Sequence, residues 1–194
     1  LVLMNVYDFD KTIYDGDSTL DFYIFSIKKN LLLLRYFPKQ FSGIILYYLK
    51  VINKERYKEF FFSFLNGIKN IDDEIKKFWE KNEKKIKNWY LNQKNEKDVV
   101  ISASPEWLLK PITDKLEINL IATKVDKRIG KFNSLNCYGN EKVKRFKEKF
   151  PNGEIENFYS DHHSDTPMFL ISENAWIVKG EKIEKWTDGK EQIK

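Results

Sequence analysis

The apolar residues of this chain follow two periodicities, and their order along the sequence restricts the folds that it can adopt. A short apolar run, Leu3–Tyr7, is typical of a buried strand. From residue 20 to about residue 95, glycine is rare and apolar residues recur at helical spacing, with Lys and Glu between them. From residue 97 onward, short β-branched runs alternate with amphipathic segments. This alternation predicts a parallel, doubly wound sheet.

The helical stretch interrupts the strand–helix pattern directly after its first strand. Its expected breaks lie near Asn30, at Pro38, around Asn53 and over residues 67–72. They predict about four helices packed as a small bundle, the last of them capped by Asn70 or Asp72. We therefore expect an α/β fold with two domains: a Rossmann-like parallel-sheet core, residues 1–18 and 96–194, and an inserted helical cap, residues 19–95.

Within the core, the expected elements follow one another closely. Strands are expected over residues 98–101, 118–123, 155–159 and 175–178, and helices over residues 105–115, 141–150 and 166–171. Ser104 is expected to cap the first of these helices, with Pro105 in its first turn. Residues 124–138 contain Gly130 and could form a hairpin.

Composition and charge exclude several classes of protein. Of the 194 residues, 42% are hydrophobic and 32% are charged, as in an ordinary globular protein. The net charge of +5 comes mostly from Lys residues interspersed with Glu and Asp, and no Arg-rich segment or known nucleic-acid-binding motif occurs. We therefore expect no nucleic-acid partner.

The sequence also predicts a cytoplasmic location. Cys137 is the only cysteine, which fits a reducing compartment. The N-terminus lacks the features of a signal peptide, and the apolar stretch Leu31–Val51 is interrupted by charged residues and Pro38, so no membrane span is expected. Leu1 is not an initiator residue, so the natural chain could begin before it or at Met4.

Two carboxylates, Asp8 and Asp10, directly follow the first apolar run. A short strand that ends in an acidic pair places charge at the edge of a sheet, where open α/β folds bind their ligands. Asp is also common in solvated turns, because its side chain hydrogen-bonds to the backbone there. The pair alone therefore leaves a turn and an active site equally open.

Three further polar clusters follow the ends of expected core elements. Ser102 ends the strand that begins at residue 98, Lys142 begins the helix after Gly139, and residues 160–165 follow the strand that ends at residue 159. In a parallel sheet these strand ends share one edge, so the clusters could converge with the acidic pair.

Such a set of side chains could transfer a phosphoryl group. Asp8, Asp10 and Asp161 are hard oxygen ligands suited to Mg²⁺, and without a cation three close carboxylates would repel one another. A carboxylate can attack phosphorus to form an aspartyl phosphate. Ser102 and Lys142 could then bind the oxygens of the transferring group.

In their order along the chain, the four clusters resemble the four signature motifs of the haloacid dehalogenase superfamily. The matching residues are Asp8 to Thr12, Ser102, Lys142, and Ser160 and Asp161 with Asp165. By position, the resemblance implies that Asp8 is the nucleophile and that Asp10 is the general acid and later the base. It also implies that Asp8, the main-chain carbonyl of Asp10, and Asp161 hold Mg²⁺, while Thr12 and Asp165 support the site.

The second carboxylate bears on the reaction type. Dehalogenases of this superfamily lack a counterpart of Asp10, because a halide leaving group needs no proton, so its presence favours a phosphatase. The helical insertion and residues 160–168 are similar to the phosphoserine phosphatase-like branch. That branch usually has a glycine-rich second motif and a Gly-Asp-Gly start to the fourth, whereas this chain has Ala103-Ser104-Pro105 and Ser160-Asp161-His162, so phosphoserine itself is not favoured as the substrate.

Two alternatives concern the substrate. Residues 8–25 are also similar to phosphatases of the same branch that act on phosphatidylglycerophosphate, and the aromatic residues Phe60–Phe62 and Tyr47–Tyr48 of the cap could suit a lipid. Aromatic residues at helical spacing usually form a core, so we expect these to do so and the substrate to be a small phosphorylated molecule. Peripheral lipid contact is the alternative, and the sequence indicates no oligomeric state.

Other functions and ligands compete with this interpretation. A phosphotransferase or mutase would use the same residues with a different acceptor, and a non-catalytic basic protein could keep the same fold. Lys144 competes with Lys142 for the role of the motif lysine. The pair His162–His163 is not expected to bind zinc, because adjacent side chains rarely face one ion.

Overall fold

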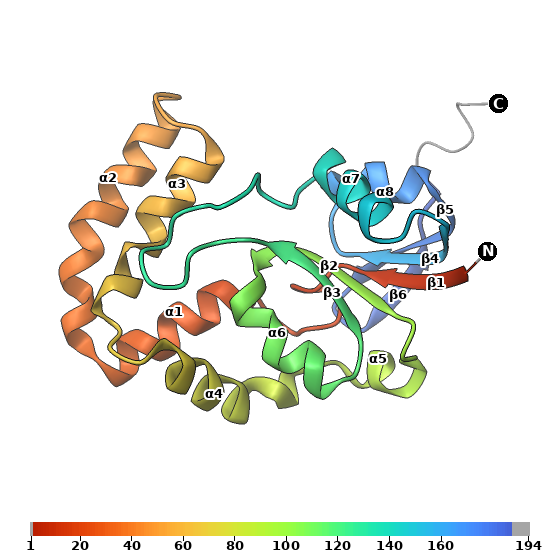
Figure 1. The fold of residues 1–194 in the computed structure, drawn as a ribbon, viewed down its shortest axis with the longest axis horizontal. Coiled ribbons are helices and arrows are strands. Elements are labelled where there is room, and N and C mark those ends of the chain that lie inside the picture. The colour runs from red at the N-terminus through yellow and green to blue at the C-terminus, as the bar shows by residue number, and fades with distance from the viewer. Residues whose placement is uncertain (1, 188–194) are drawn as a thin grey trace.

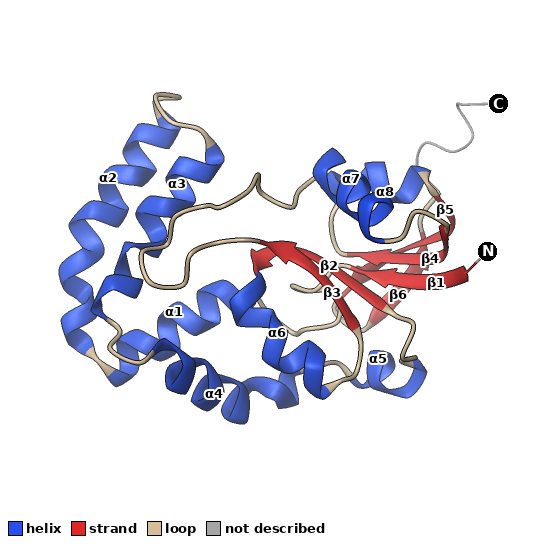
Figure 2. Ribbon diagram, in the orientation of Figure 1, coloured by secondary structure: helices blue, strands red, loops and turns tan. Residues whose placement is uncertain are grey.

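A six-stranded sheet forms the centre of the protein, in the order β3-β2-β1-β4-β5-β6 (Figures 1 and 2). The computed structural model describes residues 2–187, so Leu1 lies outside the described residues. The strands are β1 (Val2–Tyr7), β2 (Val99–Pro105), β3 (Asn119–Thr123), β4 (Gly153–Ser160), β5 (Ser172–Lys179) and β6 (Lys182–Lys185). Each neighbouring pair is parallel except β5 and β6. The predicted α/β fold with a parallel-sheet core is confirmed.

The acidic motif leaves the sheet from its centre. β1 pairs with β2 on one side and with β4 on the other, with Val6 opposite Val99 and Tyr7 opposite Tyr159. The backbone N–H of Asp8 still donates to the carbonyl of Tyr159, at 2.9 Å. Because all three strands are parallel, the residues that follow β1, β2 and β4 emerge at the same edge.

Helices cover both faces of the sheet, and alternate strand residues pack against them. α7 (Asn140–Lys149) and α8 (Thr166–Leu170) lie on one face, and α5 (Asn88–Gln93) and α6 (Glu106–Lys115) lie on the other (Figure 1). Val6 packs in the core beneath α7 and α8, whereas the next residue, Tyr7, packs in the opposite core with the α6 residue Leu108. This two-sided burial explains why the central strand β1 is almost continuously apolar.

The expected core elements are present, with three differences. The antiparallel edge strand β6 was not expected, and the hairpin expected over residues 124–138 is reduced to one antiparallel bridge between Val125 and Phe132. The prediction that Ser104 caps the helix after β2 is wrong. β2 continues to Pro105, which is the N-cap of α6, and no side chain caps that helix.

The inserted segment contains the expected helices and breaks. Its helices are α1 (Ser18–Lys29), α2 (Phe37–Tyr48), α3 (Lys54–Phe61) and α4 (Ile71–Asn82), with the 3-10 turns η1 (Leu31–Tyr36), η2 (Phe62–Gly67) and η3 (Glu83–Lys85). Pro38 lies in the first turn of α2, where its missing N–H costs no hydrogen bond. Asn70, rather than Asp72, caps α4 by accepting a hydrogen bond from the backbone N–H of Asp73 at 3.1 Å.

The two ends of the insertion are hydrogen-bonded to each other. Tyr14 and Ile86 form an antiparallel bridge. Asp15 N–H donates to the carbonyl of Lys85, and Lys87 N–H donates to the carbonyl of Ile13, both at 2.8 Å. The insertion therefore leaves and rejoins the core at one place. The exact division into domains stays a prediction. α5, which falls within the predicted cap, packs against the sheet, because its Tyr90 ring lies 4.9 Å from that of Tyr7 in β1.

α2 turns its polar side inward and its apolar side outward. Gln40 is buried and joins its neighbours by donating to the carbonyl of Phe61, at 2.8 Å, and accepting from the Tyr23 hydroxyl, at 2.7 Å. The other buried residue of α2, Gly43, lies against Phe60 of α3. As a result, the expectation of a core role is wrong for Tyr47 and Tyr48, which are 41% and 84% exposed.

The expected core role is correct for other aromatic residues of the insertion. Phe62, Phe78 and Trp79 are buried, and they share one hydrophobic core with Tyr7 and Leu108 on the sheet side. Within residues 2–187, no helix combines the length and the apolar character that crossing a bilayer requires.

The contact between α2 and α3 can be tested at Gly43. A Cβ atom on this residue would come within 2.5 Å of the Phe60 Cβ. We expect Gly43→Val to lower the free energy of unfolding by about 1–3 kcal/mol, because the added atoms must push the helices apart. Ser42→Val places the same side chain at the half-exposed position before it. Urea unfolding should show a clearly smaller loss for this control, and equal losses would contradict the prediction.

Candidate active site

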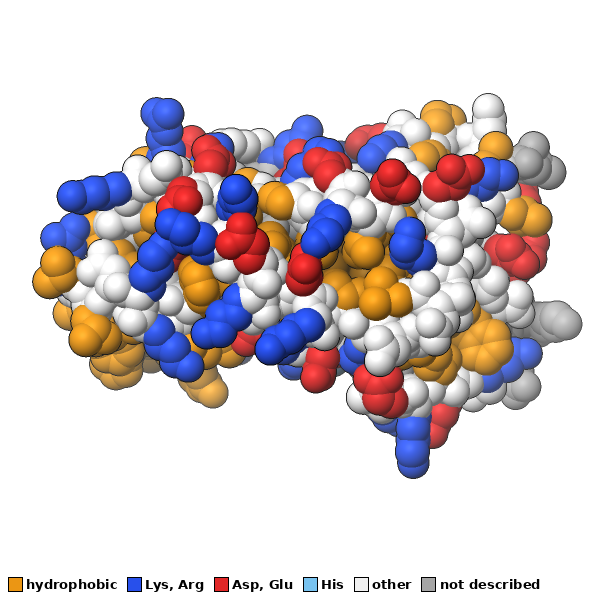
Figure 3. All heavy atoms as spheres, turned by 90° about the horizontal axis from the view of Figure 1, so that it is seen from below, with side chains coloured by type: hydrophobic (Ala, Val, Ile, Leu, Met, Phe, Trp, Pro, Cys, Tyr) orange, Lys and Arg blue, Asp and Glu red, His pale blue; other side chains and the backbone are white. Residues whose placement is uncertain are grey.

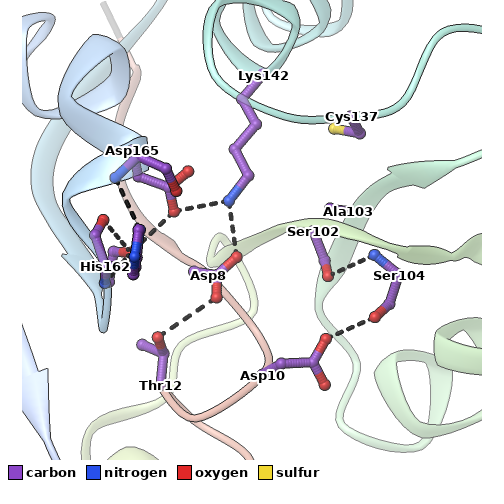
Figure 4. A network of polar contacts seen from close by, with 12 residues as sticks. Asp8, Asp10, Thr12, Ser102, Ala103, Ser104, Cys137, Lys142, His162 and Asp165 are labelled. Atoms are coloured by element: carbon purple, nitrogen blue, oxygen red, sulfur yellow. Dashed lines mark hydrogen bonds and ion pairs between the residues drawn. The ribbon is translucent and has the colours of Figure 1, made fainter. Parts of the chain in front are cut away.

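A buried lysine joins two of the carboxylates that the sequence singled out. The Lys142 ammonium donates to Asp8 Oδ1 and to Asp165 Oδ2, both at 2.7 Å (Figure 4). Asp8 follows β1, Lys142 lies in the first turn of α7, and Asp165 immediately precedes α8. Only 2% of Lys142 is exposed, so this ion-paired group lies almost wholly away from water.

Charge and burial act in opposite directions on this group. Burial alone would lower the pKa of Lys142, but the charges of Asp8 and Asp165 raise it above its ordinary value, so the ammonium is retained. Burial raises the pKa of Asp8, while Lys142 counteracts that shift. Because two carboxylates share one ammonium, the group has an excess of negative charge when both are ionised.

The two carboxylates differ in how fully their oxygens are occupied. Asp165 Oδ2 accepts a second hydrogen bond, from the Ser160 hydroxyl at 2.8 Å. Asp8 Oδ2 has only the Thr12 hydroxyl near it, at 3.5 Å. Asp8 therefore keeps one oxygen that is weakly engaged and available for another partner.

Asp10 lies in a second network, built by the insertion and the end of β2. Asp10 Oδ1 accepts from the backbone N–H of Ser18, the first residue of α1, at 2.6 Å. Asp10 Oδ2 accepts from the Ser104 hydroxyl at 2.5 Å. Burial raises the pKa of Asp10 to about 6, with a further contribution from Asp17, while the bonds from Ser104 and Ser18 hold it lower.

Ser102 and Ser104 act together in this network. The Ser102 hydroxyl oxygen accepts from the backbone N–H of Ser104 at 3.1 Å, which leaves its own proton free to donate. Ser104 is the residue that we expected to cap α6, and the structure gives its hydroxyl to Asp10 instead. Residues two apart on a strand point to the same face, so this spacing could have indicated that both serines face the site.

Asp161 lies at the same sheet edge but outside both networks. It directly follows β4 and is half-buried. Burial raises its pKa, and the charge of Lys11 opposes that shift. None of the hydrogen bonds found within residues 2–187 joins the Asp161 side chain to Asp8 or Asp10.

A lysine that the sequence did not single out reaches the site from the insertion. The Lys58 ammonium, on α3, donates to the carbonyl of Ala103 at 3.1 Å and to Asn136 Oδ1 at 3.0 Å. Burial and, to a smaller extent, the charge of Lys54 lower the pKa of Lys58 to about 8. Its target lies between Ser102 and Ser104, but nothing in the sequence distinguishes this lysine from the others on the same helix.

Two competing assignments, Lys144 and the pair His162–His163, and the single cysteine can now be compared with the structure. The side chain of Lys144 is 61% exposed and lies 3.9 Å from Glu148, so Lys142 is the lysine that meets the carboxylates. Cys137 is buried, and burial raises the pKa of its thiol to about 11, so it is a neutral thiol near pH 7. His162 Nδ1 accepts from the backbone N–H of Ser164 at 3.0 Å.

The donor atoms for a divalent cation fit Mg²⁺ in their chemistry. Asp8, Asp161 and the main-chain carbonyl of Asp10 supply only oxygen, which this ion prefers, and Asp8 has a weakly engaged oxygen. Across the described part of the chain, no three His, Cys, Asp or Glu side chains are arranged to share a metal ion. A set with two carboxylates and a carbonyl contains only two such side chains.

The ion-paired group can be tested by removing its cation. We expect Lys142→Met to lower the free energy of unfolding at pH 7 by about 3–5 kcal/mol, because it leaves two buried carboxylates without a counter-charge. Lys144→Met, two residues along the same helix, should change it by less than about 0.5 kcal/mol. Urea unfolding of both variants measures the difference. Similar small losses of unfolding free energy would show that Lys142 contributes no more to stability than an exposed lysine.

Solved structures share this fold. A protein of unknown function from Bordetella pertussis Tohama I superposes with a TM-score of 0.67 at 17% identity, covering 87% of this chain and 86% of the other. A phosphoserine phosphohydrolase-like protein from Francisella tularensis subsp. tularensis SCHU S4 superposes with a TM-score of 0.53 at 16% identity, covering 90% and 86%. At these identities the likeness concerns the fold alone.

The sequence itself matches one family model. No curated protein sequence is significantly similar to the chain. The model described as haloacid dehalogenase-like hydrolase matches residues 6–170, a span that includes Asp8, Ser102, Lys142 and Asp165. The expected resemblance to this superfamily is confirmed, and so is the expectation of a hydrolase. The chain belongs to the haloacid dehalogenase-like hydrolase family.

Proposed function

We propose that this protein is a Mg²⁺-dependent phosphatase that hydrolyses a small phosphomonoester through an aspartyl phosphate on Asp8. The observation that carries the proposal is a pair of carboxylates with different surroundings, the buried Asp8 and the partly buried Asp10. Asp8 is bound to an ammonium group, whereas Asp10 is held by a hydroxyl and a helix N-terminus. Two carboxylates held in unlike environments suit two different roles in one reaction.

In this proposal one oxygen of the Asp8 carboxylate attacks the phosphorus atom, and the other stays available to Mg²⁺. Lys142 holds Oδ1 and Thr12 lies 3.5 Å from Oδ2, so the carboxylate is held in place from both sides. As the Asp8 oxygen bonds to phosphorus, the bond between phosphorus and the ester oxygen breaks. In the second step, water attacks the same phosphorus and releases inorganic phosphate and the Asp8 carboxylate.

Asp10 moves the proton in both steps. Its pKa of about 6 lies close to neutral pH, where a side chain can both give and take a proton. It would protonate the departing ester oxygen in the first step and take a proton from water in the second. A leaving alkoxide needs this proton, which is why the second carboxylate favours a phosphomonoester over a halide.

Ser102 and Lys142 would bind the oxygens of the transferring group. The Ser102 hydroxyl has its proton free, and Lys142 brings a retained positive charge beside Asp8. Asp8, Asp161 and the carbonyl of Asp10 would hold Mg²⁺, and Asp165 would hold Lys142 in place. When bound, Mg²⁺ supplies positive charge that offsets the charge of the phosphate and of the carboxylates around it.

The location of the enzyme belongs to the same proposal. Cys137 is a free, buried cysteine, which supports a cytoplasmic, reducing compartment.

The nucleophile can be tested with an aryl phosphate. We expect Asp8→Asn to lower the turnover of p-nitrophenyl phosphate by more than about a thousandfold, because an amide cannot form the acyl phosphate. EDTA should abolish turnover by the unmodified protein, and added Mg²⁺ should restore it. Asp114→Asn, on the exposed side of α6, is the control and should keep full activity. Activity that survives Asp8→Asn or EDTA would rule out the mechanism.

The role of Asp10 can be tested through Ser104. The Ser104 hydroxyl stabilises the ionised form of Asp10, so Ser104→Ala should raise the pKa of Asp10, by about one unit for a charge-assisted hydrogen bond. Because the first step needs protonated Asp10, the pH at which kcat/KM declines on the alkaline side should move upward by the same amount. Ser42→Ala on α2 should leave the profile unchanged, and an unshifted profile for Ser104→Ala would separate Asp10 from proton transfer.

A further inference from the structure

The outward side of α2 has the composition of a buried surface. Phe41 and Ile45 are 51% and 45% exposed, whereas Gln40 on the inward side is only 5% exposed. A helix on the surface of a water-soluble domain normally has the opposite arrangement. The inward side is explained by the close approach to α3, but nothing within the described residues covers the outward side.

The exposed apolar surface continues well beyond α2. Eleven of the twenty large hydrophobic residues that are exposed within residues 2–187 fall between residues 31 and 51. They are Leu31, Leu32, Leu34, Phe37, Phe41, Ile44, Ile45, Tyr47, Tyr48, Leu49 and Val51. We call these residues the docking face. Figure 3 shows hydrophobic side chains gathered at the end of the molecule that holds α2, with Lys and Arg side chains around them. Contiguous apolar surfaces of this kind mark interaction sites.

The charge around the docking face has one sign. Residues 22–54 contain six Lys and Arg residues and no Asp or Glu, so this segment alone is more positive than the net charge of +5 of the whole chain. The six are Lys28, Lys29, Arg35, Lys39, Lys50 and Lys54. Of these, only Lys29 forms a salt bridge within the described residues, with Glu74. The Lys54 ammonium lies 3.7 Å from the centre of the Tyr138 ring, so the other four cations, Lys28, Arg35, Lys39 and Lys50, are available to an external anion.

We propose that the docking face binds the surface of an anionic lipid bilayer. A short amphipathic helix with large apolar residues on one side and Lys or Arg around them is the arrangement that lies in the interface of a membrane. α2 has 12 residues, about 18 Å at 1.5 Å per residue, which is far shorter than the ~30 Å of a bilayer core. The helix would therefore lie along the membrane, with Tyr48 at the level of the lipid headgroups, while Tyr47 stacks on Tyr57 of α3.

The charge distribution favours a bilayer over a second copy of the chain. A symmetric dimer pairs a surface with itself, so these four cations would meet the same cations of the second copy. Like charges brought together in this way oppose association. Anionic headgroups offer the opposite charge over a wide surface, and each Lys or Arg near them adds to the attraction.

Two helices, α2 and α3, separate the docking face from the candidate active site. α2 packs on α3 through Gly43 and Phe60, and Lys58, two residues earlier on α3, points to the opposite side because two residues turn the helix by about 200°. Lys58 donates to the carbonyl of Ala103, next to Ser102. A protein bound through this face would therefore hold its site about two helix diameters, ~20 Å, from the lipid surface.

Vesicle cosedimentation of the whole chain tests the proposal without relying on any enzymatic activity. We expect binding to vesicles of phosphatidylcholine and phosphatidylglycerol in equal parts to be at least about tenfold tighter than binding to phosphatidylcholine alone, and to weaken as salt is added. Phe41→Glu and Ile45→Glu should each weaken it by at least about tenfold, because each removes a large apolar group and adds repulsion. Lys39→Ala should weaken it by about fivefold.

A matched control and a separate activity assay keep the outcomes distinct. The control is Leu170→Glu on α8, because Leu170 has the same 45% exposure as Ile45. This variant should bind vesicles like the unmodified protein. Retained turnover of a soluble aryl phosphate would show that the Phe41 and Ile45 variants are folded, while loss of turnover in all proteins would bear only on the proposed hydrolysis. The proposal would be overturned if the protein did not bind anionic vesicles, or if Phe41→Glu and Ile45→Glu left the binding unchanged. It would also be overturned if the protein formed a dimer that these changes dissociate and did not bind vesicles.

Discussion

The rest of the site depends on one ammonium group that is shared by two carboxylates. Lys142 joins Asp8, at the end of β1, to Asp165, at the start of α8, although these residues are far apart in the sequence. Buried ionised groups are costly unless they are paired and hydrogen-bonded. The group of Asp8, Lys142 and Asp165 meets this condition only when β1, α7 and α8 keep their relative positions. The position of the Asp8 carboxylate therefore depends on the packing of these three elements. The two carboxylates and one ammonium also leave an excess of negative charge at the site where we propose that a cation and a phosphate bind.

The second carboxylate depends on a different part of the chain. Asp10 is held by the N-terminus of α1 and by Ser104 at the end of β2, so the insertion takes part in setting its pKa. Lys58, also from the insertion, is bound to the backbone beside Ser102. Any movement of the inserted helices away from the sheet would break these contacts together. Asp10, which we propose to transfer the proton, thus depends on the position of the insertion, whereas the contacts of Asp8 lie within the core.

The sequence was sufficient for the features that follow from strand ends. Apolar runs with polar residues directly after them predicted that Asp8 and Ser102 would emerge at one edge of the sheet, because the topology of a parallel sheet brings such ends together. The sequence could not give contacts that depend on tertiary packing. Ser104 precedes Pro105 and a helical segment, a sequence typical of a helix N-cap. In the structure β2 continues past Ser104, and its hydroxyl donates to Asp10. In α2, apolar spacing indicated a helix correctly, but only the packing of Gly43 on α3 determined which side faces outward.

The bridge between Tyr14 and Ile86 also bears on how such a protein can change over time. Since the two connections lie side by side, everything between them is a loop that is closed at its base. Lengthening, shortening or exchanging that loop would not alter the path of any strand or the pairing of β1 with its neighbours. The inserted helices, including the surface that they present, can therefore differ in sequence and length without moving the strands, provided that the contacts of Ser18 and Lys58 with the site are kept.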